Sequence, residues 1–340
     1  MGKVNSAVMS RGTLEPESLM EAIRGADLEP CQLSEGPMPS SMTRVTCPRA
    51  CLDLASFGPA LTFTGRMPDD AYTLVFVTAC PGGGQSFNFG VEHGDGYLGF
   101  FPPGGLLDAR TPEGYSNATL TVPAPVFEDA LELHFPEISD EILRRGTAVR
   151  VDAAGRRQLG DLLSGIRWSF GADREGIIGP RHGRQLGGDL IAAYMRALRS
   201  DCGREAPAAG RRLHDRHRRL RKVREFIAAH LDDPLGLEEL CREAGLSVRG
   251  TENLFRDLLG TTPIAYLRHQ RLHAVRRLLL EADPEPGTVK RVALEMGFWH
   301  PGHFTHNYRR LFGECPSTTL ARTTHRAGGR FPSSNPYSTC

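Results

Sequence analysis

The chain lacks any apolar run that approaches the roughly 20 residues a membrane-spanning helix needs. Residues 1–20 also lack the apolar stretch of a signal peptide. We therefore expect a cytoplasmic protein with no membrane partner. Hydrophobic residues make up 40% of the chain and charged residues 24%, which is typical of a globular protein. Its 340 residues exceed one ordinary core, so we expect two or three domains.

The chain also lacks the motifs of metal and phosphate chemistry. None of its eight cysteines forms a Cys-x-x-Cys pair, and the nearest approach, Cys47 and Cys51, is expected to be two reduced thiols. A metal-bearing barrel needs several clustered histidines, but residues 30–125 contain only His93. The run Gly82–Gly84 is not followed by the Lys-Ser/Thr of a P-loop and predicts a hairpin turn. No metal, cofactor or catalytic residue is expected.

The small net charge of +1 conceals an asymmetry. Residues 211–322 contain 20 Lys and Arg against 14 Asp and Glu, whereas residues 1–210 contain 19 against 26. Eight of the twelve histidines also lie in 211–322. A basic C-terminal part beside an acidic N-terminal part favours a polyanionic partner for the former.

The pattern along the chain predicts an α+β protein in five segments. These are an N-terminal helix in 1–29 (with an amphipathic pattern over 14–25), a β-rich sensor and helical dimerisation region in 30–199, a linker in 200–215, an all-α domain in 216–323 and a disordered tail in 324–340. Short β-type runs separated by turn signals fill 30–123 and favour antiparallel strands in a sandwich or barrel. Helical periodicity follows over 125–200.

The last predicted helix of the N-terminal part has an apolar stripe with two open interpretations. It could pack on its own domain or on a second copy of the chain. The stripe consists of Leu186, Leu190, Ala193, Tyr194 and Leu198.

The C-terminal part contains an internal repeat. Residues 237–263, LEELCREAGLSVRGTENLFRDLLGTTP, resemble residues 289–316, VKRVALEMGFWHPGHFTHNYRRLFGECP. The pattern aromatic-Arg-x-Leu-x-Gly-x-x-Pro recurs at an offset of 53, while the residues before the turn match at an offset of 52. The second copy therefore has one extra residue in or just after its turn.

Each copy predicts a helix, a short turn with Gly, and a second helix. In the second copy, Phe304, Tyr308, Leu311 and Phe312 form one apolar stripe. In the first, Gly245 permits a tight turn and Ser247 is a good N-cap. Residues 263–280 predict one helix between the copies, about 27 Å long. This length suits two helix-turn-helix units that read successive major grooves roughly 34 Å apart.

Residues 216–322 resemble the DNA-binding domain of AraC/XylS-type transcription regulators. The resemblance rests on LEELCREAGLS, LFRDLLGTTPIAYLRHQRLHAVRRLLL, VALEMGF and HFTHNYRRLFGECPS, about a third of the chain. The run GYLGFFPPGGLLDARTPEGYSNATLTVP is reminiscent of the sensor domains in one branch of that family. The resemblance implies a fold of two helix-turn-helix units joined by a long helix, and double-stranded DNA as the partner.

In the second unit, the resemblance implies that Pro301, Gly302, His303 and His306 face the groove. Histidine can donate to guanine N7 or to phosphate, and its charge is adjustable near neutral pH. Arg309 and Arg310 lie further along and suit phosphates. The alternative is that both histidines are merely exposed helix residues. Trp299, in the turn, is expected to pack rather than to stack on a base.

In the first unit, Arg249, Glu252, Asn253 and Arg256 take the DNA-facing places. Arg can read guanine, Asn adenine, and Glu can only accept, for example from cytosine. Arg249 could also be a solvated surface residue.

Two residues weaken the expected fit of the first unit. Gly250 weakens the helix start, and Thr251 occupies a place where the family usually has leucine. The unit could therefore be less well packed or bind through backbone contacts. The basic run from His214 to Arg224 could contact phosphate or only solvate the linker.

Together these features predict a sequence-specific DNA-binding transcription regulator that is not an enzyme. We expect a homodimer with RNA polymerase as a partner, and a small-molecule effector bound at an unknown site in the N-terminal domain. One alternative is a regulator without a ligand, controlled by abundance or a protein partner. Another is a β-barrel enzyme fused to a DNA-binding domain, which would have to use His93 with Glu92 and Asp95.

Overall fold

A computed structural model describes residues 7–14, 19–20, 22–37, 39–81, 86–88, 91–134, 147–169, 175–199 and 211–322. Its strands are β1 Ala7–Leu14, β2 Asp27–Gln32, β3 Ser40–Thr46, β4 Cys51–Ser56, β5 Leu61–Arg66, β6 Ala71–Ala79, β7 Ser86–Asn88, β8 Val91–His93, β9 Tyr97–Phe101, β10 Leu106–Thr111, β11 Ser116–Pro123, β12 Thr147–Arg150 and β13 Glu175–Ile178. Its helices are α1 Ala124–His134, α3 Ala153–Ser169, α4 Pro180–Arg199, α5 Arg211–Ala229, α6 Leu237–Ala244, α7 Val248–Leu259, α8 Pro263–Glu281, α9 Thr288–Glu295, α10 Pro301–Phe312 and α11 Pro316–Ala321.

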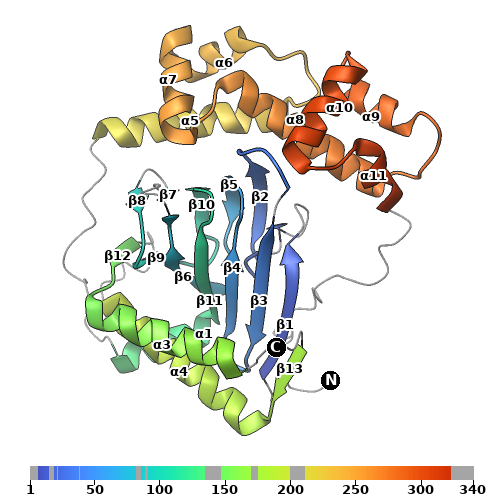
Figure 1. The fold of residues 1–340 in the computed structure, drawn as a ribbon. Coiled ribbons are helices and arrows are strands. Elements are labelled where there is room, and N and C mark those ends of the chain that lie inside the picture. The colour runs from blue at the N-terminus through green and yellow to red at the C-terminus, as the bar shows by residue number, and fades with distance from the viewer. Residues whose placement is uncertain are drawn as a thin grey trace.

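Two antiparallel sheets form the N-terminal part, which confirms the predicted β-rich domain (Figure 1). One sheet has the strand order β12-β9-β6-β11-β4-β3-β1-β13 and the other has β2-β5-β10-β7-β8. Apolar residues of both sheets meet in one core, which includes Met42 and Val77 from the larger sheet and Leu28 and Phe63 from the smaller one. Alternation of side chains along each strand explains how one face of each sheet reaches this core.

Helices α1, α3 and α4 cover the opposite face of the larger sheet and bury a second apolar core against it (Figure 1). The α4 stripe packs on its own domain, since Leu190, Tyr194 and Leu198 are buried there. The Tyr194 hydroxyl donates a hydrogen bond of 2.8 Å to the Ala118 carbonyl of β11. This resolves the choice between the two interpretations of the stripe.

The predicted N-terminal helix in 1–29 is wrong over the residues that the structure describes. Residues 7–14 form β1, which pairs with β3 and β13, and residues 27–32 form β2. Residues 15–18 and 21, which fall in the amphipathic pattern, lie outside the described residues. Pairing with strands distant in sequence decided the conformation of β1, and local periodicity carries no information about such partners.

Strands β12 and β13 lie within 125–200, where helical periodicity was predicted and no strand was. Each has four residues, and each pairs at an edge of the larger sheet, with β9 and β1 respectively. A four-residue strand is too short to show a period of two clearly. The predicted C-terminal tail in 324–340 lies outside the described residues.

The C-terminal part is entirely helical among its described residues, as predicted, and has two separate cores. The first combines α5, α6 and α7 with the beginning of α8, and the second combines the end of α8 with α9, α10 and α11. Helix α8 thus contributes Tyr266 and Leu267 to one core and Val275 and Leu279 to the other. Helix α5 begins at Arg211, inside the segment predicted to be a linker.

No helix among the described residues is long and apolar enough to cross a membrane. Cys47 and Cys51 are both buried, and burial raises the pKa of each thiol to about 12. Their reactive thiolate form is therefore scarce at neutral pH.

Candidate nucleic-acid interface

The first helix-turn-helix unit consists of α6 and α7, joined by a tight turn. Gly245 adopts φ 61° at the end of α6, a left-handed conformation that costs glycine little. Ser247 then caps α7, because its hydroxyl accepts a 3.2 Å hydrogen bond from the Gly250 N–H. The turn and the cap were both predicted from these residues.

The core of this unit is better packed than its sequence predicted. Thr251 is fully buried, and its hydroxyl donates a 3.1 Å hydrogen bond to the Ser247 carbonyl. A buried hydroxyl with a partner avoids the cost of an unpaired polar group. Leu254, Phe255 and Leu258 are buried beside it, so α7 has a complete apolar face.

The predicted contact residues of the first unit lie on the opposite face of α7. Arg249, Asn253 and Arg256 are exposed, while Glu252 is half-buried. A helix that buries one face and exposes long polar side chains on the other can enter a major groove.

The second unit consists of α9 and α10. Its predicted stripe is confirmed, because Phe304, Tyr308, Leu311 and Phe312 are all buried. The turn has five residues, 296–300, against three in the first unit, 245–247. The repeat predicted one extra residue, and the turn is two residues longer because α9 also ends one position before the equivalent of the α6 end.

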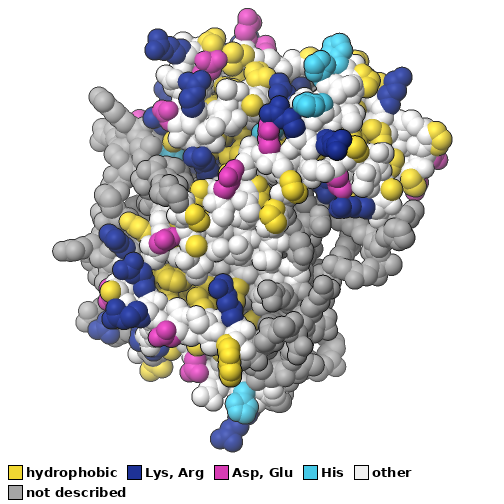
Figure 2. All heavy atoms as spheres, viewed as in Figure 1, with side chains coloured by type: hydrophobic (Ala, Val, Ile, Leu, Met, Phe, Trp, Pro, Cys, Tyr) yellow, Lys and Arg dark blue, Asp and Glu magenta, His cyan; other side chains and the backbone are white. Residues whose placement is uncertain are grey.

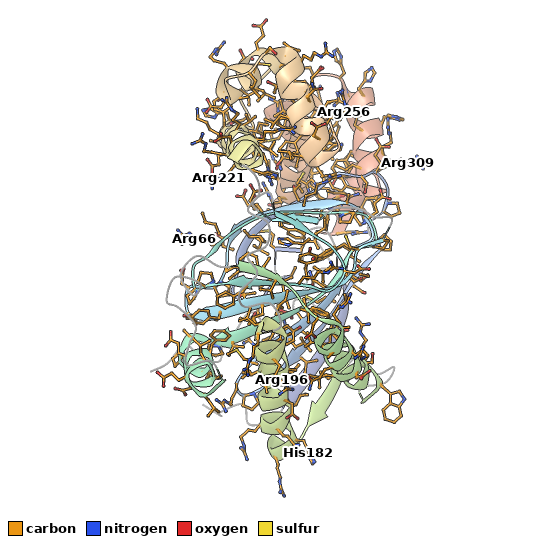
Figure 3. All side chains as sticks on the ribbon, turned by 90° about the vertical axis from the view of Figure 1, so that its left-hand side faces the viewer. Arg66, His182, Arg196, Arg221, Arg256 and Arg309 are labelled. Atoms are coloured by element: carbon orange, nitrogen blue, oxygen red, sulfur yellow. The ribbon has the colours of Figure 1, made fainter. Side chains whose placement is uncertain are left out.

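The predicted contact residues of the second unit are all exposed. They are Pro301, Gly302, His303, His306, Arg309 and Arg310. Figure 2 shows histidine and Lys or Arg side chains gathered at the upper right, where Figure 1 places α8 to α10. Arg256 of α7 and Arg309 of α10 lie on the same side of the molecule (Figure 3). The fold therefore presents both units toward one side.

The N-terminus of α10 has no side-chain cap. His300 is the N-cap residue but its side chain makes no capping hydrogen bond, and Pro301 follows it without an N–H. The first free N–H groups of the helix are therefore those of Gly302 and His303. Such groups, together with the helix dipole, favour an anion such as a DNA phosphate.

Trp299 does not pack as predicted. Its side chain is 72% exposed in the turn before α10, beside the exposed His300. An exposed tryptophan next to a recognition helix is a candidate DNA contact that sequence reasoning assigned to packing. The sequence signal for this exposure is the position of Trp299 in the longer turn, outside the apolar stripe.

Arg310 does not present a free guanidinium to phosphate in this structure. It forms a bidentate ion pair with Glu35, through hydrogen bonds of 2.8 Å and 2.5 Å. Glu35 belongs to the segment that follows β2 in the N-terminal part. Sequence reasoning could not find this contact because the two residues are 275 positions apart.

The same segment of the N-terminal part caps the C-terminus of α10. The Gly36 N–H donates 2.8 Å to the Arg310 carbonyl, and Gln32 Nε2 donates 2.9 Å to the Leu311 carbonyl. The Gln32 N–H also donates to Nε2 of His273 on α8 at 2.9 Å. The second unit is thereby held by β2 and the residues after it.

The first unit is held by β10. Asp108 forms a buried ion pair with Arg224 of α5, and Arg224 also donates 2.9 Å to the Tyr266 hydroxyl. Arg110 donates 3.5 Å to the Leu258 carbonyl at the end of α7. The N-terminal part therefore contacts both units directly.

The basic run that enters the domain forms ion pairs and carbonyl contacts in this structure. Arg216 pairs with Asp257, Arg218 with Asp215 and Lys222 with Glu243, while Arg219 donates to the carbonyls of Ala244 and Gly245. Arg221 lies on the side of the molecule opposite to Arg256 and Arg309 (Figure 3). The contacts of these residues therefore favour a structural role over a phosphate-binding one.

Comparison with known proteins identifies the C-terminal part. The family described as a helix-turn-helix domain matches residues 240–322. The XylDLEGF operon transcriptional activator 1 of Pseudomonas putida is 34% identical over 143 residues, which cover 42% of this chain and 41% of the activator. The probable thc operon regulatory protein of Rhodococcus erythropolis is 36% identical over 102 residues, covering 30% of this chain and 31% of that protein.

Solved structures match the same part. A probable AraC family transcriptional regulator from Rhodopseudomonas palustris is 38% identical, covers 31% of this chain and 97% of its own, and has a TM-score of 0.29. The chain spans about two fifths of the length of the Pseudomonas relative that it matches. The matched region contains both helix-turn-helix units that the structure shows. Residues 240–322 are therefore a helix-turn-helix domain of the kind found in AraC/XylS-type transcription regulators.

Proposed function

We propose that this chain regulates transcription by binding a DNA site of two successive major grooves, one for α7 and one for α10. The observation that carries the proposal is the pair of exposed polar helix faces on a common connector, α8. Arg249 and Asn253 read bases in one groove, and His303 and His306 contact bases or backbone in the other. Glu252, Arg256 and Arg309 complete the interface, with Pro301 and Gly302 at the α10 N-terminus against a phosphate.

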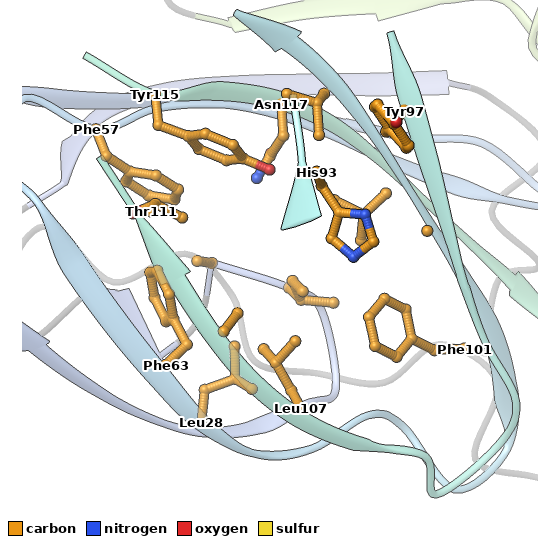
Figure 4. Close-up of a pocket in the computed structure, with 16 residues that line it drawn as sticks. Leu28, Phe57, Phe63, His93, Tyr97, Phe101, Leu107, Thr111, Tyr115 and Asn117 are labelled. Carbon is orange, nitrogen blue, oxygen red and sulfur yellow. The ribbon is translucent and has the colours of Figure 1, made fainter. Parts of the chain in front are cut away.

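We further propose that a small molecule in the N-terminal domain controls this binding. A cavity of about 70 Å³ lies between the two sheets, and β2 and β10 form part of its wall (Figure 4). Leu107, Ala109 and Thr111 of β10 line the cavity, while the alternate residues Asp108 and Arg110 contact the DNA-binding domain. A ligand that shifts β10 therefore moves the anchors of the first unit as well.

Strand β2 gives the second unit a comparable connection. Leu28 lines the cavity, while Cys31 of the same strand packs in the core of the first unit. Gln32, at the end of this strand, caps α10. Ligand binding can thus alter the relative placement of α7 and α10 through two strands, which is what a change in DNA affinity requires.

RNA polymerase and a second copy of this chain are the protein partners that we propose. The name of the Pseudomonas relative describes an activator, which supports the first of them. The α4 stripe is buried in its own domain, so a dimer has to use another surface. Trp168 of α3 is 85% exposed and offers apolar area for one.

The test is selection of a binding site from random duplex DNA by the full chain, followed by fluorescence anisotropy across a salt series. We expect an enriched motif with two half-sites about one helical turn apart, and a steep salt dependence. Retention of all sequences with equal affinity would contradict sequence-specific reading. A ligand-independent regulator would show the same motif but no change in affinity with any small molecule.

A further inference from the structure

The cavity between the sheets has an unusually simple lining. Its walls are formed mostly by aromatic and aliphatic side chains, including Phe57, Phe63 and Phe101 (Figure 4). Among the lining residues that the structure describes, none is Asp, Glu, Lys or Arg. A bound carboxylate or ammonium group would lose its hydration here without gaining an opposite charge, which is strongly unfavourable.

Two polar side chains in the lining have unused hydrogen-bonding capacity. His93 of β8 is 8% exposed and Thr111 of β10 is 4% exposed. Neither His93 Nδ1 nor Thr111 Oγ1 has a hydrogen-bond partner within the part of the chain that the structure describes. Buried polar atoms in native proteins normally have partners, so two such atoms that line one cavity are available to hydrogen-bond a ligand group.

The chemistry of these two groups limits what they can bind. Burial lowers the pKa of His93 to about 4, so its imidazole is neutral at physiological pH. A neutral imidazole has one donor and one acceptor nitrogen, and a threonine hydroxyl can both donate and accept. A ligand hydroxyl, which can also do both, would satisfy either side chain.

The volume limits the size of the ligand. A cavity of about 150 Å³ accommodates benzene in an engineered protein. At about 70 Å³ the present cavity is smaller, so its side chains have to adjust even for one ring. A single ring is therefore the size of ligand that this cavity favours.

We propose that this cavity binds an uncharged, mostly apolar molecule of about one ring that bears a hydroxyl group, hydrogen-bonded by His93 and Thr111. This inference rests on the proposed control by a small molecule and specifies its chemical class. Phenols and small cyclic alcohols belong to that class.

The experiment compares phenol, toluene and benzoate, which carry a hydroxyl, a methyl and a carboxylate on the same ring. Affinities for the full chain are measured by ligand-observed NMR titration. We expect phenol to bind at least tenfold more tightly than benzoate. His93→Phe and Thr111→Val should each lower the ratio of phenol to toluene affinity, by roughly tenfold for His93→Phe.

The control variant is Thr73→Val, which removes another buried and unpartnered hydroxyl that does not line the cavity. Thr73→Val should leave the ratio of phenol to toluene affinity unchanged. Benzoate binding as tight as phenol, an unchanged ratio in both cavity variants, or no binding of any probe would overturn the inference. Binding of the selected DNA site is measured on the same preparations. Failure of the ligand inference can then be distinguished from failure of the proposed DNA binding.

Discussion

The two helix-turn-helix units share a sequence pattern but differ in how their recognition helices begin and end. Helix α7 begins with an internal cap from Ser247, whereas α10 begins with no side-chain cap. At the other end, α10 is capped by residues of the N-terminal part, while Arg110 donates to the last turn of α7. The first recognition helix therefore begins with a cap of its own, whereas the second is bonded at its end to the N-terminal part.

Two units with the same sequence pattern can therefore respond differently to one signal. Open N–H groups at the start of α10 are available to a phosphate, and its last turn is bonded to the segment after β2. A movement of β2 would consequently act directly on the last turn of the second recognition helix.

The two cores should unfold separately. Phe255→Ala removes an aromatic ring from the first core and Phe304→Ala from the second, and each should lower the free energy of unfolding of its unit by roughly 3–5 kcal/mol. Hydrogen exchange of the full chain should show faster exchange in α6 and α7 for one variant and in α9 and α10 for the other. Equal acceleration of all helices by both variants would show a single cooperative core.

Both recognition helices should contribute to DNA affinity. Arg249→Ala and His306→Ala should each weaken binding to the selected site by roughly 1–3 kcal/mol, because each removes a base or phosphate contact. Anisotropy with wild-type and half-site-scrambled DNA provides the measurement. Arg221→Ala is the matched control, since this arginine lies on the opposite side of the molecule (Figure 3). A comparable loss in the control would refute the assignment of faces.

Acid should loosen the attachment of the second unit. Burial, with further contributions from His269, Arg277 and Arg276, lowers the pKa of His273 to about 3, whereas an unfolded histidine titrates near 6.5. The unfolded chain therefore binds more protons between these values. The free energy of unfolding is therefore highest above about pH 6.5, and it decreases by up to about 1.4 kcal/mol per pH unit as the pH falls below that value.

Hydrogen exchange of α8 and α10 between pH 7 and pH 4.5, corrected for intrinsic exchange rates, measures this effect. His273→Gln keeps an acceptor for the Gln32 N–H but does not titrate, so the pH dependence of these helices should flatten. A pH dependence as steep as in the wild type would show that other groups are responsible.

Substitution of the N-cap residue should affect the stability of α7 more than that of α10. Ser247→Ala removes the cap of α7 and should destabilise the first unit by about 1 kcal/mol. His300→Ala should leave the stability of the second unit nearly unchanged, because its side chain caps nothing. Chemical denaturation monitored by exchange in α7 and α10 compares them. Equal losses in the two variants would remove the proposed distinction between the helix starts.

Release of Arg310 should strengthen DNA binding slightly. The ion pair with Glu35 is about half exposed, so it is worth less than about 1 kcal/mol. Glu35→Gln should therefore raise DNA affinity by at most about fivefold and steepen the salt dependence by about one unit. Glu225→Gln, which removes a surface carboxylate beside Arg221, changes the net charge equally and is the control. An identical gain in the control would indicate a general charge effect.

Much of the C-terminal domain could be predicted because its determinants are local. The stripe Phe304, Tyr308, Leu311 and Phe312 follows from a period of 3.6 residues, and the Ser247 cap follows from its position before a helix. The N-terminal part was less predictable. Strands β1, β12 and β13 depend on partners distant in sequence. In the C-terminal part the exposure of Trp299 was not predicted, because this residue lies outside any periodic pattern.

Local sequence patterns specify the two helix-turn-helix units, because backbone turns, caps and apolar periodicity act over a few residues. Three other arrangements follow from tertiary packing: the ion pair of Glu35 with Arg310, the ion pair of Asp108 with Arg224, and the apolar cavity that His93 and Thr111 line together. Each of these arrangements joins residues brought together by strand pairing and domain packing. Such contacts depend on the positions of whole elements, which no local pattern specifies.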